Sequence, residues 1–304
     1  VYTIHNIAYQ GIFGNRVLEI SGLSSYGFIA HPSVAPELNQ VFDFMARGIL
    51  FADQVNAVSE TYAREIQMPE FGERLDPILR ERKDCVSGIL NGIDCDWYNP
   101  ATDPNIAQKF DVTLIDARAA NKLALQQECG LPQNPDLPIL AMVSRLNDLK
   151  GIDLVADTID HILDTLNVQF VMMGTGDQHY HDFFTRLRQH YPDRIAIFLT
   201  FDNARARKIY AGADMLLMPS RTEPSGSSQM IAMRYGCIPI VRATGGLADS
   251  VEDFDARGEA RGTGFVFRPH DRWALFAAAT RAVQMYHTPQ LWRALQERAM
   301  ARDS

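Results

Sequence analysis

The chain has 304 residues, of which 46% are hydrophobic, and this is enough to bury the cores of two domains. Its 37 acidic and 29 basic residues give a net charge of −8 without a basic run, which argues against nucleic acid or an anionic membrane surface as a partner. No apolar run approaches the roughly 20 residues that cross a bilayer, and four cysteines without a CxxC pair favour a reducing compartment over disulfides or a zinc site.

The first third of the chain is predicted to hold short strands and helices with loops between them. Residues 14–37 contain Gly and Pro and no clear period, which predicts an irregular surface segment. The remaining apolar patterns predict strands at 1–4, 55–58 and 86–90 and helices at 42–51 and 61–66.

Two of these strands end in polar residues. His5 and Asn6 follow the first strand, and Asn91 follows the third. A histidine at a strand end is more often structural than functional, and the Asn-Gly pair that begins at Asn91 is a common turn signal. Position alone therefore assigns these residues no role.

A proline-bearing break at residues 99–104 predicts the boundary between two domains. We place this boundary after Asp103, so that residues 1–103 form the end of one domain and residues 104–304 form another.

Alternating strands and helices from residue 139 onward predict an α/β domain with an open parallel sheet. One helix is expected to begin at Ser227 or Ser228. The strands are expected at 139–143, 168–173, 195–199, 214–218, 237–241 and 262–267.

In such a sheet the loops that follow the strands meet at one edge, where ligands bind. Here these loops carry Arg145, Lys150, Glu223 and a helix start at Gly226-Ser227. A guanidinium, an ammonium and a helix N-terminus form a suitable clamp for a diphosphate. The alternatives also remain open on the residues alone: ordinary strand-to-helix loops, with Arg145 and Lys150 in solvated ion pairs and Glu223 capping a helix.

Two further patterns in this half have plain explanations. Gly174-Thr-Gly-Asp177 is not a dinucleotide fingerprint, because the third glycine is absent, and a tight turn is the default interpretation. His179 and His181 are two positions apart on a helix and point in different directions, so we expect surface histidines and no metal site.

Long motifs in both halves carry a resemblance to a known family. The C-terminal one contains Glu-Pro-x-Gly at 223–226, Gln229, Met-Arg-Tyr-Gly at 233–236 and Pro-Ile-Val-Arg-x-Thr-Gly-Gly-Leu-x-Asp at 239–249. HNIAYQG at 5–11, NAVSETYAREI at 56–66 and LNGID at 90–94 belong to the N-terminal half. Together they resemble the bacterial glycogen synthases and plant starch synthases. Thr222, Ser225 and Ser227 depart from the pattern, since the family has an aromatic residue, Cys and Leu there.

The resemblance implies an α/β fold of the GT-B type, in which two Rossmann-like domains face a cleft. Residues 1–103 would be the last part of the acceptor-side domain, and residues 104–304 would be the nucleotide-sugar-binding domain. The family's opening Lys-Thr-Gly-Gly-Leu motif does not precede Val1, and the family's helix that crosses back to the first domain would lie beyond Ser304. The chain is therefore expected to be truncated at both ends and not to elongate glycogen by itself.

The implied reaction is the retaining transfer of glucose from ADP-glucose to the non-reducing end of an α-1,4-glucan, with UDP-glucose as the second candidate donor. No cofactor or divalent metal is expected, and neither a nucleic acid nor a membrane partner. The location would be the cytoplasm of a bacterium or the plastid stroma of a plant. Two alternatives remain: a non-catalytic glucan-binding homologue, and a transferase with another donor or acceptor.

The resemblance also implies roles for particular residues. The catalytic residues would be Glu223, His5, Lys150 and Arg145. The substrate-binding residues would be Asn6, Asn91, Gly176, Asp177, Gly226, Ser227, Thr244, Gly245 and Gly246.

Overall fold

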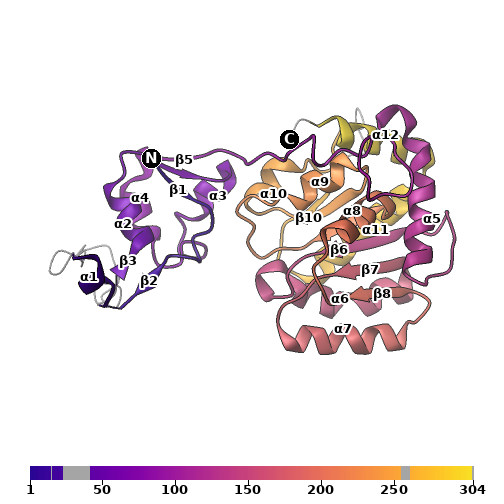
Figure 1. Ribbon diagram of the computed structural model, residues 1–304, viewed down its shortest axis with the longest axis horizontal. Coiled ribbons are helices and arrows are strands. Elements are labelled where there is room, and N and C mark those ends of the chain that lie inside the picture. The colour runs from indigo at the N-terminus through magenta and orange to yellow at the C-terminus, as the bar shows by residue number, and fades with distance from the viewer. Residues whose placement is uncertain (15, 23–41, 255–260, 303–304) are drawn as a thin grey trace. The chain divides into compact units, whose positions relative to one another are not determined.

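The computed structural model describes residues 1–14, 16–22, 42–254 and 261–302, and it divides into two units, Val1–Asn91 and Gly92–Ser304 (Figure 1). Each unit has its own sheet and its own hydrophobic core.

A six-stranded parallel sheet forms the centre of the second unit, with the strand order β11-β10-β9-β6-β7-β8. All the strands predicted beyond residue 139 are present, so the predicted α/β class with an open parallel sheet is confirmed. The strands are β6 (Ile139–Val143), β7 (Gln169–Met173), β8 (Ile195–Phe198), β9 (Met215–Met218), β10 (Ile238–Arg242) and β11 (Phe265–Phe267).

Helices cover both faces of this sheet (Figure 1). Along β6, Leu140 and Met142 pack into one buried cluster, and Ile139 and Ala141 pack into the other. Because both faces are covered, the strands are apolar throughout, and they appear in the sequence as continuous apolar runs. The helices are α5 (Arg118–Glu128), α6 (Ile152–Thr165), α7 (Gln178–His190), α8 (Asn203–Gly212), α9 (Ser228–Arg234), α10 (Gly245–Ser250), α11 (Arg272–Tyr286) and α12 (Pro289–Ala301).

The first unit has a three-stranded parallel sheet with the order β1-β4-β5, and a separate antiparallel pair, β2 and β3. Its core is a single cluster that includes Ile4, Ile49 and Tyr62. The strands are β1 (Tyr2–Ile4), β2 (Ile12–Phe13), β3 (Phe42–Asp43), β4 (Val55–Ala57) and β5 (Val86–Gly88). The helices are α1 (Arg16–Ser21), α2 (Phe44–Phe51), α3 (Glu60–Glu65) and α4 (Asp76–Glu81).

The predictions for the first unit hold with two corrections. All three predicted strands and both predicted helices are present, but the helix predicted at 42–51 begins only at Phe44, because Phe42 and Asp43 form β3. The irregular segment predicted at 14–37 was wrong for residues 16–21, which form α1, because the Gly and Pro residues of that segment outweighed a short apolar pattern. Residues 15 and 23–37 of that segment lie outside the described residues.

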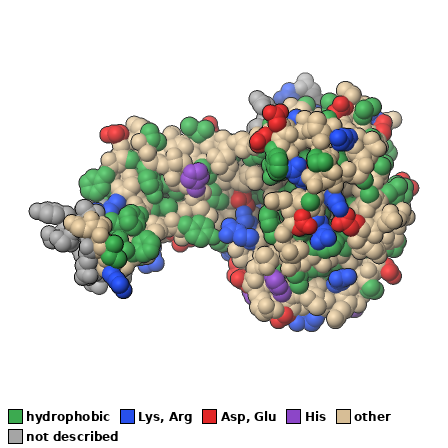
Figure 2. All heavy atoms as spheres, viewed as in Figure 1, with side chains coloured by type: hydrophobic (Ala, Val, Ile, Leu, Met, Phe, Trp, Pro, Cys, Tyr) green, Lys and Arg blue, Asp and Glu red, His purple; other side chains and the backbone are tan. Residues whose placement is uncertain are grey.

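Both units expose charged and apolar side chains. In Figure 2, acidic and basic side chains are intermixed over the visible face of the second unit. Large apolar side chains are exposed on the first unit, among them Tyr9, Phe13 and Phe44, and on the second, among them Trp97 and Trp273. In the described part of the chain, no helix combines the length and the apolar character needed to span a membrane.

The division between the units falls after Asn91, earlier than the position after Asp103 that the proline-bearing break predicted. Buried contacts explain the difference. The Tyr235 hydroxyl donates a hydrogen bond of 2.5 Å to Asp103, and the Arg207 guanidinium lies 3.3 Å from the same carboxylate. Arg207 also lies over the Trp97 ring, 4.4 Å from its centroid. Residues 92–103 therefore pack with the second unit.

Candidate functional site

Four loops meet at the edge of the second unit's sheet where the parallel strands β6, β7, β9 and β10 end. Backbone hydrogen bonds join them in pairs. The amide of Leu146 donates to Thr175, and the amide of Arg221 donates to Leu149. The amide of Gly246 donates to Glu223 over 3.0 Å. The predicted convergence of these loops is therefore present in the structure.

Two glycines allow the loops after β9 and β10 to touch through their main chains. A Cβ atom on Gly245, whose φ is +44°, would lie 2.0 Å from the carbonyl oxygen of Glu223. A Cβ on Gly246 would lie 2.0 Å from the carbonyl oxygen of Ser225. No other residue fits such an approach without a shift of the backbone.

The centre of this edge is an ion pair between Lys150 and Glu223. The Lys150 ammonium lies 2.6 Å from Oε2 of Glu223, and the Ser220 hydroxyl donates to the same oxygen over 3.0 Å. The Glu223 side chain is only 7% exposed and that of Lys150 is 21% exposed. A carboxylate this deeply buried needs a cation and hydrogen bonds, and both are present.

The contacts of Glu223 and Lys150 bear on the alternatives left open for them. Within the described residues, the Glu223 side chain accepts hydrogen bonds from Lys150 and Ser220, and from no backbone amide at the start of α9 or α10. Lys150 pairs with a buried carboxylate, so its ion pair is not a solvated one. Arg145 lies exposed in the loop directly after β6.

The turn after β7 contains Gly176 and Asp177, both exposed. The amide of Gly176 donates to Nε2 of His181 over 3.1 Å, which ties the turn to the first part of α7. Tyr180, which is on the same helix, donates a hydrogen bond to Asp148 in the loop after β6. Burial and this hydrogen bond raise the pKa of the Tyr180 hydroxyl. His181 thus has a local structural role that the sequence pattern did not indicate.

The start of α9 lies between the two glycine turns. Ser227 occupies the N-cap position, as predicted, but its side chain makes no cap hydrogen bond. The Gln229 amide nitrogen donates to the carbonyl oxygens of Ser225 and Gly226 and to the Ser250 hydroxyl on α10. The Ser225 hydroxyl is buried and has no hydrogen-bond partner among the described residues. Thr244 is fully buried at the start of α10.

A second group of charged side chains makes hydrogen bonds and ion pairs at the same edge of the sheet. Asp153 on α6 accepts from Arg221 over 2.8 Å, and His270 lies 3.2 Å from the same oxygen. The Arg242 guanidinium at the end of β10 donates to the carbonyl oxygens of Arg221 and Ser220. Only tertiary contacts bring these residues together, so the sequence carried no signal for them.

The predicted residues of the first unit lie at the edge of its own sheet. His5 and Asn6 follow β1, and Asn91 follows the segment that leaves β5; both strands run parallel to β4 between them. His5 and Asn91 are exposed. The Asn6 side chain accepts from the amide of Ala8 and so closes a turn.

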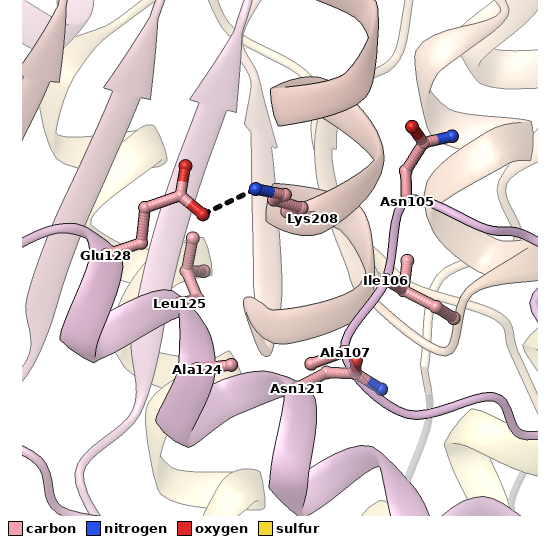
Figure 3. A pocket seen from close by; sticks show the side chains of 8 residues that line it. All are labelled: Asn105, Ile106, Ala107, Asn121, Ala124, Leu125, Glu128 and Lys208. Atoms are coloured by element: carbon pink, nitrogen blue, oxygen red, sulfur yellow. Dashed lines mark hydrogen bonds and ion pairs between the residues drawn. The ribbon is translucent and has the colours of Figure 1, made fainter.

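A cavity of about 250 Å³ lies elsewhere in the second unit, between α5, α8 and the chain just before α5 (Figure 3). Its charged groups, Glu128 and Lys208, already pair with each other over 2.7 Å. The Asn121 side chain exchanges two hydrogen bonds with the backbone of Gln108. None of the predicted site residues lines this cavity. A search of the described ranges finds no group of three or more His, Cys, Asp or Glu residues that could hold a metal ion.

The chain is similar to known proteins over nearly all of its length. Residues 1–81 match the family model for the starch synthase catalytic domain, and residues 128–299 match the model for glycosyl transferases group 1. The chain is 47% identical to a glycogen synthase of Anaeromyxobacter dehalogenans and 44% identical to one of Thermotoga maritima, in each case over the whole chain and 62% of the relative. The catalytic domain of starch synthase IV from Arabidopsis thaliana, solved with ADP and acarbose bound, is 34% identical. It superposes with a TM-score of 0.88 over 99% of this chain and 62% of that one.

Proposed function

The chain belongs to the group 1 glycosyl transferases, and from this membership we propose that it transfers glucose from ADP-glucose to the non-reducing end of an α-1,4-glucan with retention of configuration. The resemblance to glycogen and starch synthases supports this donor and acceptor. The chain spans about 62% of the length of these relatives, and its fold is the α/β fold of the GT-B type. The observation that carries the proposal is the Lys150–Glu223 pair at the edge where the strands end.

The chemistry centres on the departure of a nucleoside diphosphate. Negative charge develops on the diphosphate as the bond to the sugar breaks, and fixed cations placed beside it lower the barrier. Lys150 and Arg145 are the cations that would face this charge. The backbone at Gly226 and Ser227 would contribute N–H groups at the start of α9.

Glu223 is the carboxylate proposed to face the sugar. It would accept hydrogen bonds from ring hydroxyls and stabilise the positive charge that develops at the anomeric carbon. A double displacement would require a second well-placed carboxylate. The sequence identifies no second carboxylate as placed for that role, and the resemblance to glycogen and starch synthases supports departure and attack on one face of the sugar. His5, Asn6 and Asn91 are proposed to contribute from the first unit, and Gly176 and Asp177 to face the nucleotide.

The test has two stages. In the first, calorimetry of residues 1–304 with ADP is expected to give weak binding that declines as salt rises, because exposed charges are screened. In the second, a hybrid in which residues 1–304 replace the matching segment of the Anaeromyxobacter glycogen synthase receives ADP-glucose labelled in the sugar, with glycogen as acceptor. Labelled α-1,4-linked glucose in the glycogen is the expected product.

Each stage can contradict the proposal separately. If the protein is folded but binds no ADP, the proposed nucleotide-binding site is wrong. A hybrid that binds ADP-glucose and glycogen without transfer would favour a non-catalytic glucan-binding protein. Transfer from UDP-glucose but not from ADP-glucose would correct the donor.

A further inference from the structure

The two oxygens of the Glu223 carboxylate have different surroundings. Oε2 accepts from the Lys150 ammonium over 2.6 Å and from the Ser220 hydroxyl over 3.0 Å. No hydrogen bond from any described residue reaches Oε1. One oxygen is therefore held by the protein, and the other remains for a ligand.

The two donors to Oε2 differ in how firmly they are fixed. The Lys150 ammonium lies at the end of a flexible four-carbon stem. The whole Lys150 side chain is 21% exposed. Ser220 is 2% exposed, and a single side-chain torsion joins its hydroxyl to the backbone. Arg242 donates to its carbonyl oxygen over 3.4 Å, and the neighbouring Arg221 amide donates to Leu149 over 2.9 Å. The Ser220 hydroxyl makes no hydrogen bond to any other described side chain.

A diphosphate bound at this edge would compete with Glu223 for the Lys150 ammonium. As Lys150 turns towards the phosphate oxygens, the carboxylate loses its strongest donor and, without another, could rotate away from the sugar. Ser220 is too short and too well anchored to follow a ligand. Its hydroxyl can therefore keep Oε2 in place in the loaded site.

We propose that Ser220 is a positioning residue that fixes the Glu223 carboxylate towards the sugar of the bound donor while Lys150 faces the diphosphate. This inference rests on the proposed function, because it takes the ligand to be a sugar nucleotide. It predicts that Ser220 acts on recognition of the sugar and has little effect on recognition of the nucleotide.

The experiment measures the affinities of residues 1–304 for ADP and for ADP-glucose by calorimetry. Ser220→Ala removes the hydroxyl, and Ser220→Cys keeps the side-chain volume with only a weak donor. For both variants, ADP-glucose affinity is expected to fall by about tenfold, the scale for losing one hydrogen bond to a charged group. ADP affinity is expected to change by less than about twofold, since no bond to the nucleotide is lost. Ser220→Thr keeps a hydroxyl and is expected to restore discrimination between the two ligands.

Thr158→Ala is the matched control. Thr158 is 1% exposed and donates its hydroxyl to Leu154 within α6, so this variant also loses a buried hydroxyl of the second unit. Its melting temperature is expected to fall while its ratio of ADP-glucose to ADP affinity stays at the wild-type value.

The outcomes separate this inference from the proposed function. An unchanged ADP-glucose affinity in both Ser220→Ala and Ser220→Cys would overturn the positioning role. An equal loss of affinity for ADP and for ADP-glucose would also overturn the positioning role, because such a result would indicate a general disturbance of the loop. Wild-type protein that binds neither ligand would instead refute the proposed function, and the role of Ser220 would fall with it.

Discussion

At the scale of single residues, the site depends on a cation in an unfavourable place. Lys150 directly precedes Gly151 and the start of α6, where a positive charge opposes the positive end of the helix dipole. Glu223 compensates this charge from a different loop, 73 residues further along the chain. A cation held in this way is available to an anion that enters the site.

We expect Lys150→Ala to weaken ADP binding and, in the hybrid enzyme, to reduce turnover more than glucan binding. The loss of transition-state stabilisation should be about 2–4 kcal/mol, the scale for one electrostatic stabiliser. Initial rates at saturating and limiting ADP-glucose measure this loss. Lys208→Ala is the control, because Lys208 is a lysine of the same unit whose ion pair lies at the cavity on α5 and α8. A Lys150→Ala enzyme as fast as wild type would place Lys150 outside the site.

The protein cations proposed to neutralise the leaving group also predict the response to chelators. Transfer by the hybrid should be the same with and without excess EDTA, because Lys150 and Arg145 would provide the charge that a divalent ion provides in other enzymes. Rates measured after dialysis against EDTA, and again after Mg²⁺ or Mn²⁺ is added back, test this. Strong inhibition that only the metal reverses would contradict the proposed clamp.

At the scale of elements, continuous apolar runs predicted the strands of the second sheet because that sheet is covered on both faces. The same reasoning located the loops at the strand ends, since parallel strands finish at one edge. It could not find the two-residue strands β2 and β3, which are too short to have a period. It also missed the six-residue α1, because the Gly and Pro residues of that segment indicated irregular structure.

Contacts between distant segments were also out of reach. The hydrogen bond from the Ser220 hydroxyl to Glu223 depends on the path of the loop after β9, which no sequence pattern specifies. Tyr235 and Asp103 are 132 residues apart in the sequence. Their hydrogen bond attaches the proline-bearing break to the second unit, so the division between the units falls before it. A local pattern carries no information about such pairings.

The contact between α10 and the loop after β9 leads to a prediction about Gly245. In Gly245→Ala the new methyl group would meet the Glu223 carbonyl oxygen, so the loop must shift. We expect a loss of about 2–4 kcal/mol of unfolding free energy, from backbone strain and overpacking together. ADP affinity should fall as well. Urea unfolding and calorimetry provide the two measurements.

Gly130→Ala is the matched control for this prediction. Gly130 has φ +68°, and a Cβ there would meet nothing within 4 Å, so the substitution introduces backbone strain alone. It should cost about 1 kcal/mol and leave ADP binding intact. Equal effects of the two substitutions on ADP affinity would argue against a special fit at Gly245.

At the scale of the whole molecule, the buried carboxylate of Asp103 holds residues 92–103, which follow the first unit, against the rest of the second unit. Burial opposes ionisation of Asp103, but hydrogen bonds from Tyr235 and Asn105 and the charge of Arg207 outweigh it and lower its pKa below the ordinary value of 3.8. A carboxyl group whose pKa is lower in the folded state stabilises the fold above its unfolded pKa. This contribution is lost as the pH falls below 3.8 towards the folded value.

We expect Asp103→Asn to lower the unfolding free energy near neutral pH by about 3 kcal/mol, because Arg207 is left buried without its carboxylate. The difference from wild type should shrink as the pH drops below 3.8, because the Asp103 carboxyl of the unfolded wild-type chain takes up a proton there before that of the folded protein does. Urea unfolding at neutral pH and at about pH 3 measures both effects. Asp116→Asn is the control, since the Asp116 side chain is 82% exposed and its ion pair with Arg293 should contribute little. A constant difference across this pH range would show that the charge of Asp103 is not responsible.

The close approach of Gly245 and Gly246 to residues 223–225 restricts which amino-acid substitutions this protein can accept during evolution. The fit is between main chains, and the atoms that a new side chain would strike are carbonyl oxygens. No change of a neighbouring side chain can make room for it, so mutation at either glycine has no nearby suppressor. The side chains of the same loop are under no such restriction. Thr222, Ser225 and Ser227 can therefore differ from the residues typical of glycogen and starch synthases without loss of the main-chain contacts at Gly245 and Gly246.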